Sequence, residues 1–192
     1  MHPKIYNLFG ESLAECEIRG SVLEIGTQRG QMSLLKLPVF DRADRKLGVN
    51  LDGPFDFDDI NVAKGSANHM QMFPDGSIEC VLCNAVLEHD KKFWLTLRKI
   101  NRVSAPNGLL AIGTPSYKDH MFAKYTLKWG NDTFLKDFLR NATFCYHIHD
   151  HPVDYYRFSE ETYLDVFFEG YHNIKVRTIM TPPRTVGWGY KA

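Results

Sequence analysis

The sequence predicts an α/β protein in which short buried strands alternate with helices. The central observation is the stretch 21–30, where the largely apolar run 22–25 ends in two glycines, Gly26 and Gly30. Hydrophobic residues then resume at Met32, Leu34 and Leu35, an order typical of a buried strand, a tight turn and the start of a helix. Both glycines allow positive φ and close backbone approach, so a ligand can lie against the turn. In an open α/β sheet, ligands usually bind in the crevice between the end of a strand and the start of the following helix.

The composition limits the class of protein. A chain of 192 residues suits one domain, 1–192, and can bury a sizeable core. Lys plus Arg and Asp plus Glu both number 23, so no chain-wide field attracts a nucleic-acid backbone. The chain has neither an apolar run of membrane-spanning length nor a signal-peptide pattern at its start. We therefore expect a soluble, cytoplasmic protein that binds neither nucleic acid nor membrane; the sequence is silent on its oligomeric state.

The first half of the chain predicts a helix and three strands. Residues 5–18 carry apolar side chains mostly at helical spacing, which predicts an amphipathic leading helix within 1–20. Residues 32–37 predict a helix that Pro38 stops, and 46–52 and 60–63 predict the second and third strands with the exit of the second. Residues 53–59 combine Gly, Pro and three aspartates. A divalent cation is one interpretation of that run, and the solvated loop that we favour is the other.

The second half continues the alternation. Residues 78–83 predict the fourth strand, and apolar residues at helical spacing over 93–103 predict a helix. A Pro-Asn-Gly turn at 106–108 ends that helix before a fifth strand over 109–115. Ser159 has the features of an N-cap for a helix over 163–168. The runs 174–179 and 186–191 predict the last two strands, joined by a turn at Pro182 and Pro183.

Cysteines and histidines raise the question of a metal. Cys80 and Cys83 form a Cys-x-x-Cys, but residues three apart on a strand point to opposite faces, so their sulfurs would not converge on one ion. No second pair completes a tetrahedral site, and we interpret both as buried thiols. His147, His149 and His151 would project to one face of an extended segment and could hold a transition metal. We predict no metal at these histidines.

Residues 22–30 resemble the first motif of class I S-adenosylmethionine-dependent methyltransferases. Glu24, Gly26 and Gly30 stand in the expected places, whereas Gln28 occupies a position where the family usually has glycine. Further landmarks follow in the family's order: a Gly-Ser-Ala segment at 65–67, a Phe-Pro-Asp-Gly-Ser turn at 73–77, Leu-Glu-His at 87–89, and Asp-Tyr-Tyr-Arg-Phe-Ser at 154–159. The last two resemble the type 11 group. This resemblance implies one Rossmann-like domain with a seven-stranded, mostly parallel sheet, an antiparallel last strand and helices on both faces.

The resemblance also implies the residues that bind the cofactor, S-adenosyl-L-methionine. Similar proteins place an acidic residue after the second strand, where it binds both ribose hydroxyls. The aligned position is Asn50, which we rank first, with Asp52 as the alternate. Ser66 replaces an aspartate that contacts the adenine. The implied cofactor-binding residues are Glu24, Gly26, Thr27, Gln28, Gly30, Asn50, Asp52, Ser66, Ala67 and Asn84.

The acceptor side is implied less directly. Residues 116–158 form an insertion after the fifth strand that, in this fold, commonly covers the acceptor. Its interleaved aromatics and lysines could also stack nucleobases, but because the net charge of the chain is zero we favour a substrate lid over a nucleic-acid surface. Tyr117, Asp154 and Arg157 are the expected substrate residues. Methyl transfer needs an in-line approach of the acceptor, and a hydroxyl acceptor also needs a base. His89 and His151 are the catalytic candidates, with Asp154 behind them.

Three functions are consistent with these motifs. We favour a methyltransferase that acts on a small molecule, such as a sugar, a lipid or another metabolite, by O- or N-methylation. A catalytically silent S-adenosylmethionine-binding protein is the alternative, suggested by the departures from the family pattern at Gln28, Asn50 and Ser66. An NAD-dependent oxidoreductase is disfavoured because Gly26-x-x-x-Gly30 does not fit the Gly-x-Gly-x-x-Gly fingerprint.

Overall fold

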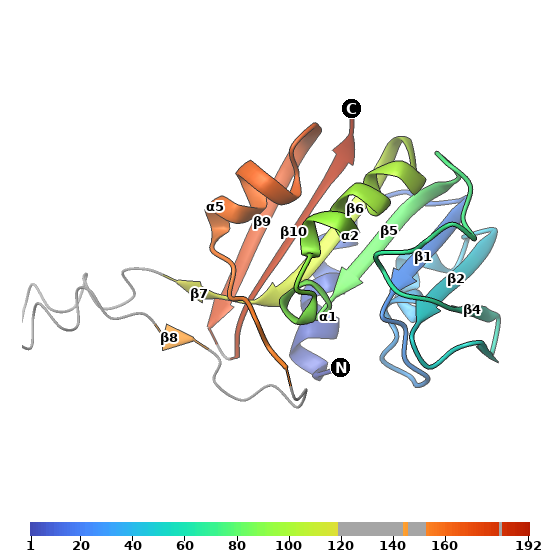
Figure 1. Ribbon diagram of the computed structural model, residues 1–192, viewed down its shortest axis with the longest axis horizontal. Helices are drawn as coiled ribbons and strands as arrows, with labels where there is room; N and C mark the ends of the chain where they lie inside the picture. Colours follow the sequence, from blue (N-terminus) through green and yellow to red (C-terminus); the bar gives the residue numbers. More distant parts are fainter. Residues whose placement is uncertain (119–143, 146–152, 181) are drawn as a thin grey trace, which may run out of the picture.

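A mixed sheet of eight strands forms the centre of the protein (Figure 1), seen in a computed structural model that describes residues 1–118, 144–145, 153–180 and 182–192. The strands β4, β2, β1, β5 and β6 run parallel, β3 is antiparallel at one edge, and β10 is antiparallel between β6 and β9. In spatial order the strands are β3 (Phe55–Phe57), β4 (Ile60–Lys64), β2 (Arg45–Asn50), β1 (Ser21–Ile25), β5 (Ile78–Asn84), β6 (Ser104–Pro115), β10 (Pro183–Lys191) and β9 (Tyr171–Met180).

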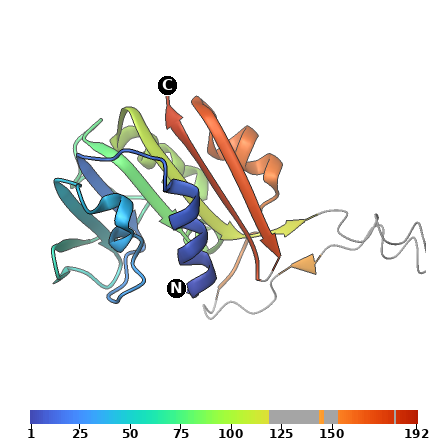
Figure 2. The ribbon, with the colours of Figure 1, turned by 180° about the vertical axis from the view of Figure 1, so that it is seen from behind.

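Helices cover both faces of the sheet. The helix α1 (Pro3–Leu13) and the two 3-10 turns η1 (Leu34–Lys36) and η2 (Pro38–Phe40) pack on one face. The helix α2 (Phe93–Val103) and the π-helical turn η4 (Tyr163–Phe167), which follows α5 (Glu160–Thr162), pack on the other (Figures 1 and 2). Each face buries its own apolar cluster because successive strand residues point to opposite sides. The predicted mostly parallel sheet with an antiparallel last strand and helices on both faces is confirmed.

The two cysteines of the Cys-x-x-Cys motif illustrate that alternation. Cys80 lies in the cluster beneath α1, and Cys83 lies in the cluster beneath α2. Both are fully buried free thiols. Because they lie in clusters on opposite faces of the sheet, the prediction that their sulfurs point to opposite faces is confirmed.

The sheet has one strand more than predicted. Residues 55–57, which were expected to form part of a loop, pair antiparallel with β4 as the edge strand β3. Phe55 and Phe57 alternate with the exposed Asp56 and pack against the core beneath α1, which is the period of two that a half-buried strand requires. The aspartates in this segment are typical of a polar loop, so the short alternation of a strand was not recognised in the sequence.

The prediction of an α-helix over residues 32–37 is wrong. Only Leu34–Lys36 forms one 3-10 turn, and Leu37 is extended with ψ 137° before Pro38. The α conformation is disfavoured for a residue that precedes proline, so the turn ends at this position. The carboxylate of Glu24 also accepts hydrogen bonds from Ser33 Oγ and from the Leu34 N–H. These side-chain bonds hold the segment without helical ones.

Other boundaries differ by shorter lengths. The helix α1 ends at Leu13, and β6 already begins at Ser104, because the predicted turn at 106–108 is an irregularity inside the strand. Ser159 caps α5 as predicted, its Oγ accepting from the Thr162 N–H at 3.4 Å. The remaining elements are the 3-10 turn η3 (Leu87–His89) and the paired strands β7 (Tyr117–Lys118) and β8 (Phe144–Cys145). Among the described helices, none has the length and apolar character needed to cross a membrane.

Candidate functional site

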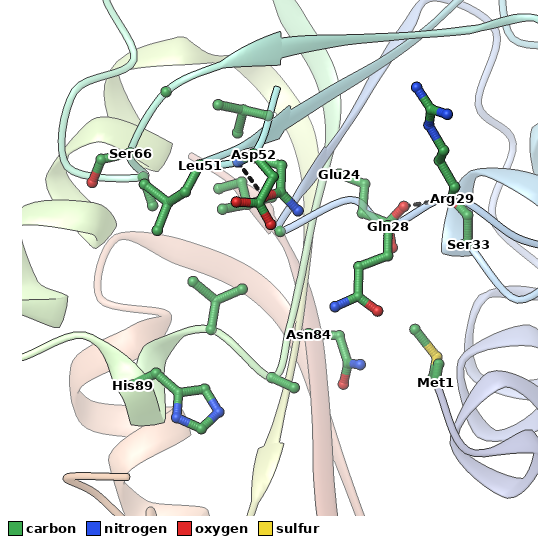
Figure 3. Close-up of a pocket in the computed structure, with 18 of the residues that line it drawn as sticks. Met1, Glu24, Gln28, Arg29, Ser33, Leu51, Asp52, Ser66, Asn84 and His89 are labelled. Atoms are coloured by element: carbon green, nitrogen blue, oxygen red, sulfur yellow. Dashed lines mark hydrogen bonds between the residues drawn. The ribbon is translucent and has the colours of Figure 1, made fainter. Parts of the chain in front are cut away.

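A cavity of about 700 Å³ opens at the carboxyl ends of β1, β2, β4 and β5. This is the edge of an open α/β sheet where ligands bind, and the volume is typical of small-molecule sites. In Figure 3, Leu51 and Ser66 lie toward one end of the cavity, whereas Gln28 and Met1 lie toward the other. The cavity therefore has room for an elongated ligand along the strand ends.

The turn after β1 brings backbone against this cavity. Gly26 has φ +79°, and its N–H donates a hydrogen bond to the Val49 carbonyl at 2.9 Å. A Cβ at this position would lie 2.7 Å from Val86 Cγ2, closer than real contacts allow. Gly30, with φ +136°, also lines the cavity. Both positions therefore favour glycine, one for space and backbone conformation and the other for conformation alone.

Glu24 holds the chain that follows this turn. Its side chain is buried, and its two oxygens accept from Ser33 Oγ at 2.6 Å and from the Leu34 N–H at 3.1 Å. Burial raises the pKa of Glu24 from 4.5 to about 7, against the hydrogen bond from Ser33, which favours the ionised form. Glu24 also borders the cavity, so it links the shape of the first turn to the site.

Thr27 and Asn50 join the first two strand ends. Thr27 is fully buried, does not line the cavity, and donates from Oγ1 to the Glu24 carbonyl at 2.5 Å. The Asn50 side-chain amide donates to the Thr27 carbonyl at 2.7 Å. The Asn50 side-chain oxygen accepts from the Asp52 N–H at 3.0 Å (Figure 3). Both ends of the Asn50 side chain are thus engaged with the backbone.

An exposed apolar side chain and an exposed acidic side chain lie just beyond the end of β2. Leu51 is 69% exposed although it is a large apolar residue, and it lines the cavity beside the exposed Asp52. Ser66 and Ala67, after β4, border the same end. The Ser66 hydroxyl accepts from the Asn68 N–H at 3.2 Å and keeps its own hydrogen for a further acceptor. At this end of the cavity, Leu51 provides a contact surface for a planar apolar ligand, and the Asp52 carboxylate can accept hydrogen bonds from hydroxyl groups.

Asn84 closes the other end. It is the last residue of β5, and its Oδ1 is buried without a hydrogen-bond partner among the residues that the structure describes. A buried unpartnered oxygen costs free energy. Asn84 lines the cavity with a polar side chain whose oxygen is itself buried.

His89 stands on the rim of the cavity. Its Nδ1 lies 2.5 Å from the Val153 carbonyl oxygen, which can only accept, so Nδ1 carries a hydrogen. Its Nε2 lies 3.9 Å from Oε1 of Glu88, a fully buried carboxyl whose Oε1 is also 3.6 Å from Arg184 Nη1. Burial raises the pKa of Glu88 from 4.5 to about 7, and the Arg184 charge opposes that rise. His89 is thus held by a backbone carbonyl on one side and faces a buried carboxyl on the other.

The residues expected to contact substrate lie elsewhere. Arg157 Nη1 donates to Asp154 Oδ1 at 2.5 Å, and neither residue lines the cavity. Tyr117 lies on β7 and does not line it either. His151, the proposed second base, the other histidines of its cluster and most of the lid 116–158 fall outside the described residues.

A model of the methyltransferase domain family matches residues 4–153 of this sequence. The chain belongs to this family. S-Adenosylmethionine is therefore the cofactor of this methyltransferase, and the predicted class I assignment is confirmed. A comparison with curated protein sequences finds no significant match.

Solved structures share the fold of the methyltransferase at low sequence identity. YcgJ from Bacillus subtilis is 15% identical with a TM-score of 0.62, over 99% of both chains. A possible histamine N-methyltransferase from Thermotoga maritima is 18% identical with a TM-score of 0.60, over 97% of this chain and 89% of that one. The 1,6-didemethyltoxoflavin N1-methyltransferase from Burkholderia thailandensis is 12% identical with a TM-score of 0.61, over 99% and 77%.

The residues of the methyltransferase fit the cofactor in chemistry as well as in space. An S-adenosyl group presents an aromatic base, a ribose with two hydroxyls and an amino acid end. The cavity offers the exposed Leu51, the carboxylate of Asp52 and the side-chain amide of Asn84. Apolar, anionic and amide groups are thus all present for such a ligand.

The structure brings together all the sequence-predicted cofactor residues of the methyltransferase except Thr27, which is buried beneath them. Several other residues that line the cavity, among them Leu51 and Asp90, were not predicted from the sequence. Asp90 accepts hydrogen bonds from Asn68 and Thr96 and so ties the rim to α2. Its position directly after Leu-Glu-His was the available signal. Leu51 gave a signal only as an apolar residue just past a strand end.

Proposed function

We propose that this methyltransferase transfers a methyl group from S-adenosylmethionine to an oxygen or nitrogen atom of a small-molecule acceptor. The observation that carries the proposal is the cavity at the strand ends, with the glycine turn at one wall and His89 on its rim. The bound cofactor supplies a methyl group already activated by the positive charge on its sulfur. The remaining task of the chain is to orient donor and acceptor in line and to exclude water.

Cofactor binding is assigned to residues that line the cavity. Gly26 lets the backbone approach closely, and Asp52 and Ser66 present polar groups at the nucleoside end. The side-chain amide of Asn84, which lines the cavity, is the polar group assigned to the amino acid end. Glu24 keeps the wall in place rather than contacting ligand, because its two oxygens already accept from Ser33 and Leu34.

His89 is the proposed proton acceptor for a hydroxyl acceptor. With Nδ1 donating to the Val153 carbonyl, the neutral ring carries its lone pair on Nε2, which makes Nε2 the basic nitrogen of the ring. An amine acceptor would need only to arrive deprotonated. His151 remains a candidate outside the described residues. Asp154 is a weaker one, because its carboxylate pairs with Arg157.

We also propose that residues 116–158 form the cover of the acceptor site. The two ends of this segment lie together, since Ser116 Oγ donates to the Phe158 carbonyl at 2.7 Å. Its last part rests on η3 through the Tyr155 N–H, which donates to the Glu88 carbonyl at 2.7 Å, next to His89. These contacts of the described end residues support a cover of the acceptor site near His89. Small-molecule acceptance also agrees with the 1,6-didemethyltoxoflavin that is bound to the Burkholderia thailandensis neighbour.

Calorimetric titration with S-adenosylhomocysteine and, separately, with NAD tests the cofactor site. We expect saturable binding of the first and none of the second; the opposite result would overturn the proposal. A panel of sugars, lipids, amines and phenols is then assayed for production of S-adenosylhomocysteine. Turnover restricted to a macromolecular substrate, with every small molecule inert, would overturn the acceptor class.

A further inference from the structure

Asn68 and Asp90 join two segments that follow strands far apart in the sheet. The strands β4 and β5 are separated by β2 and β1, so three strand spacings, about 14 Å, lie between them. The segments that follow these strands nevertheless meet, because the Asn68 side-chain amide donates to both carboxylate oxygens of Asp90, each at 3.1 Å. We call this contact the Asn68–Asp90 clasp. Both of its residues line the cavity, so the clasp belongs to the wall of the site.

The other partners of Asp90 hold it to the turn that carries His89. Its Oδ2 accepts from Thr96 Oγ1 at 2.8 Å, and its Oδ1 accepts from the Lys92 N–H at 2.8 Å. The Asp90 N–H also donates to the Leu87 carbonyl at 3.3 Å. The residue directly after His89 is thus fixed both to η3 and to α2, so the position of the His89 backbone follows that of Asp90.

Asn68 is tied in turn to a residue that we assign to the nucleoside end of the cofactor. Its N–H donates to Ser66 Oγ at 3.2 Å. Ser66 and His89 lie toward the same side of the cavity (Figure 3). A ligand that orders Ser66 therefore also orders Asn68, and the clasp extends this order to the turn at His89.

The clasp depends on one amide facing one carboxylate. The amide has two hydrogens to donate, and hydrogen bonds to an ionised acceptor are roughly twice as strong as neutral ones. Aspartate at position 68 would have no hydrogen to donate and would place a like charge against Asp90. An exchange of the two residue types would keep one amide and one carboxylate. Thr96 Oγ1 lies 3.5 Å from Asn68 Oδ1, so its hydroxyl has an acceptor nearby in either arrangement.

We propose that Asn68 and Asp90 are positioning residues of the methyltransferase, whose clasp transmits binding of the S-adenosyl group at Ser66 to the turn that carries His89. This inference rests on the cofactor site of the proposed function. The clasp fixes the nucleoside end of the cavity relative to the rim on the acceptor side, which is the relative placement that an in-line transfer requires.

Binding calorimetry with S-adenosylhomocysteine tests the clasp without any turnover. Asn68→Asp should weaken binding by about tenfold or more, because it replaces the donor with a like charge. The exchange Asn68→Asp/Asp90→Asn should restore the affinity to within about threefold of wild type, a recovery that two independent sites would not give.

The chain contains a matched control for this substitution. Asn61 Nδ2, on β4, donates to Asp56 Oδ1, on β3, at 3.2 Å, and neither residue lines the cavity. Asn61→Asp therefore creates the same pair of facing carboxylates away from the site. This variant should bind S-adenosylhomocysteine with the affinity of wild type.

Nuclear magnetic resonance of ring-labelled histidine measures the effect on His89 itself. Its signal is assigned by its loss in His89→Ala and is compared between proteins saturated with S-adenosylhomocysteine. Asn68→Ala breaks the clasp without adding a charge, so its His89 signal should differ from that of saturated wild type. The exchange variant and Asn61→Asp should both reproduce the wild-type signal.

Thermal unfolding shows whether each variant is folded. If Asn68→Asp is not, Asn68→Ala carries the binding test, with an expected loss of about three- to tenfold. Wild-type affinity in the clasp variants, an exchange variant that binds no better than Asn68→Asp, or a wild-type His89 signal in saturated Asn68→Ala would overturn the inference while leaving the proposed function standing. Wild-type protein that does not bind S-adenosylhomocysteine would overturn both.

Discussion

Ser33 Oγ donates a hydrogen bond of 2.6 Å to Glu24 Oε2 inside the protein, and this bond joins the first strand to the chain that follows the glycine turn. Both side chains are buried and both border the cavity. The same carboxylate accepts from the Leu34 N–H, so one acidic side chain organises a segment that has no α-helix. The stability of the fold and the shape of the cofactor site therefore depend on the same contact.

Removal of this contact should lower stability measurably. Ser33→Ala leaves a buried carboxylate oxygen without its donor, and we expect the free energy of unfolding to fall by about 1–3 kcal/mol in urea denaturation. Ser77→Ala is the control, because Ser77 Oγ donates to the Pro74 carbonyl at 2.7 Å on the exposed surface. The control should lose less than about 0.5 kcal/mol. Equal losses in the two variants would contradict the role of burial.

Gly26→Ala should weaken cofactor binding beyond its effect on stability. The added Cβ would lie 2.7 Å from Val86 Cγ2 on the cavity wall, at a φ of +79°. Gly170→Ala is closely matched, with φ +78° and nothing within 4 Å of the new Cβ. Both variants should lose about 1–2 kcal/mol of stability through backbone strain. Only Gly26→Ala should bind S-adenosylhomocysteine at least about tenfold more weakly by calorimetry. Wild-type affinity in that variant would show that the turn does not contact the cofactor.

His89→Ala should separate chemistry from cofactor binding. With a hydroxyl acceptor found in the screen, we expect kcat to fall by about 100-fold or more, because general base catalysis contributes on that scale. The affinity for S-adenosylhomocysteine should change little, since the ring stands on the rim of the cavity. A variant with wild-type kcat removes His89 from the list of catalytic residues.

Glu88 should make stability depend on pH. Its pKa is about 7 in the folded protein against 4.5 in an ordinary glutamate, so between these values the folded state binds more protons than the unfolded state. The free energy of unfolding contributed by this group is therefore greatest below about pH 4.5 and is lost as the pH rises through 7. Relative to Glu88→Gln, wild type should lose about 1–3 kcal/mol between pH 5 and pH 8.

Urea denaturation of wild type and Glu88→Gln at several pH values measures this difference. Glu24, whose raised pKa acts in the same direction, is present in both proteins and cancels. Parallel profiles for the two proteins would show that Glu88 has an ordinary pKa in the folded state.

The buried thiols should resist alkylation. Burial raises the pKa of both Cys80 and Cys83 well above the ordinary value, so neither forms the reactive thiolate in the native protein. Iodoacetamide at pH 8, followed by peptide mass spectrometry, should leave both unmodified in native protein and modify both after unfolding in urea. Rapid native labelling of either residue would contradict its placement in the core.

Much of the architecture is readable in the sequence because strand and helix periodicities are local. The apolar runs predicted the positions of β1, β2, β4 and β5, and the alternation along β5 correctly placed Cys80 and Cys83 on opposite faces. The helix α2 was predicted with its observed bounds from the spacing of its apolar residues. The glycine turn and most residues that border the cavity also followed from motifs next to strand ends.

The three-dimensional contacts decided what each residue at those strand ends does. Residues 32–37 form no α-helix because Glu24 comes within hydrogen-bond distance of Ser33 and Leu34 in the folded chain, and periodicity alone suggested an α-helix. The use of Asn50 depended on the Thr27 carbonyl, which comes from the turn after β1. A one-dimensional pattern records which residue types follow one another. Hydrogen bonds between strand ends depend on which groups remain unpaired after folding, so only the tertiary structure assigned those roles.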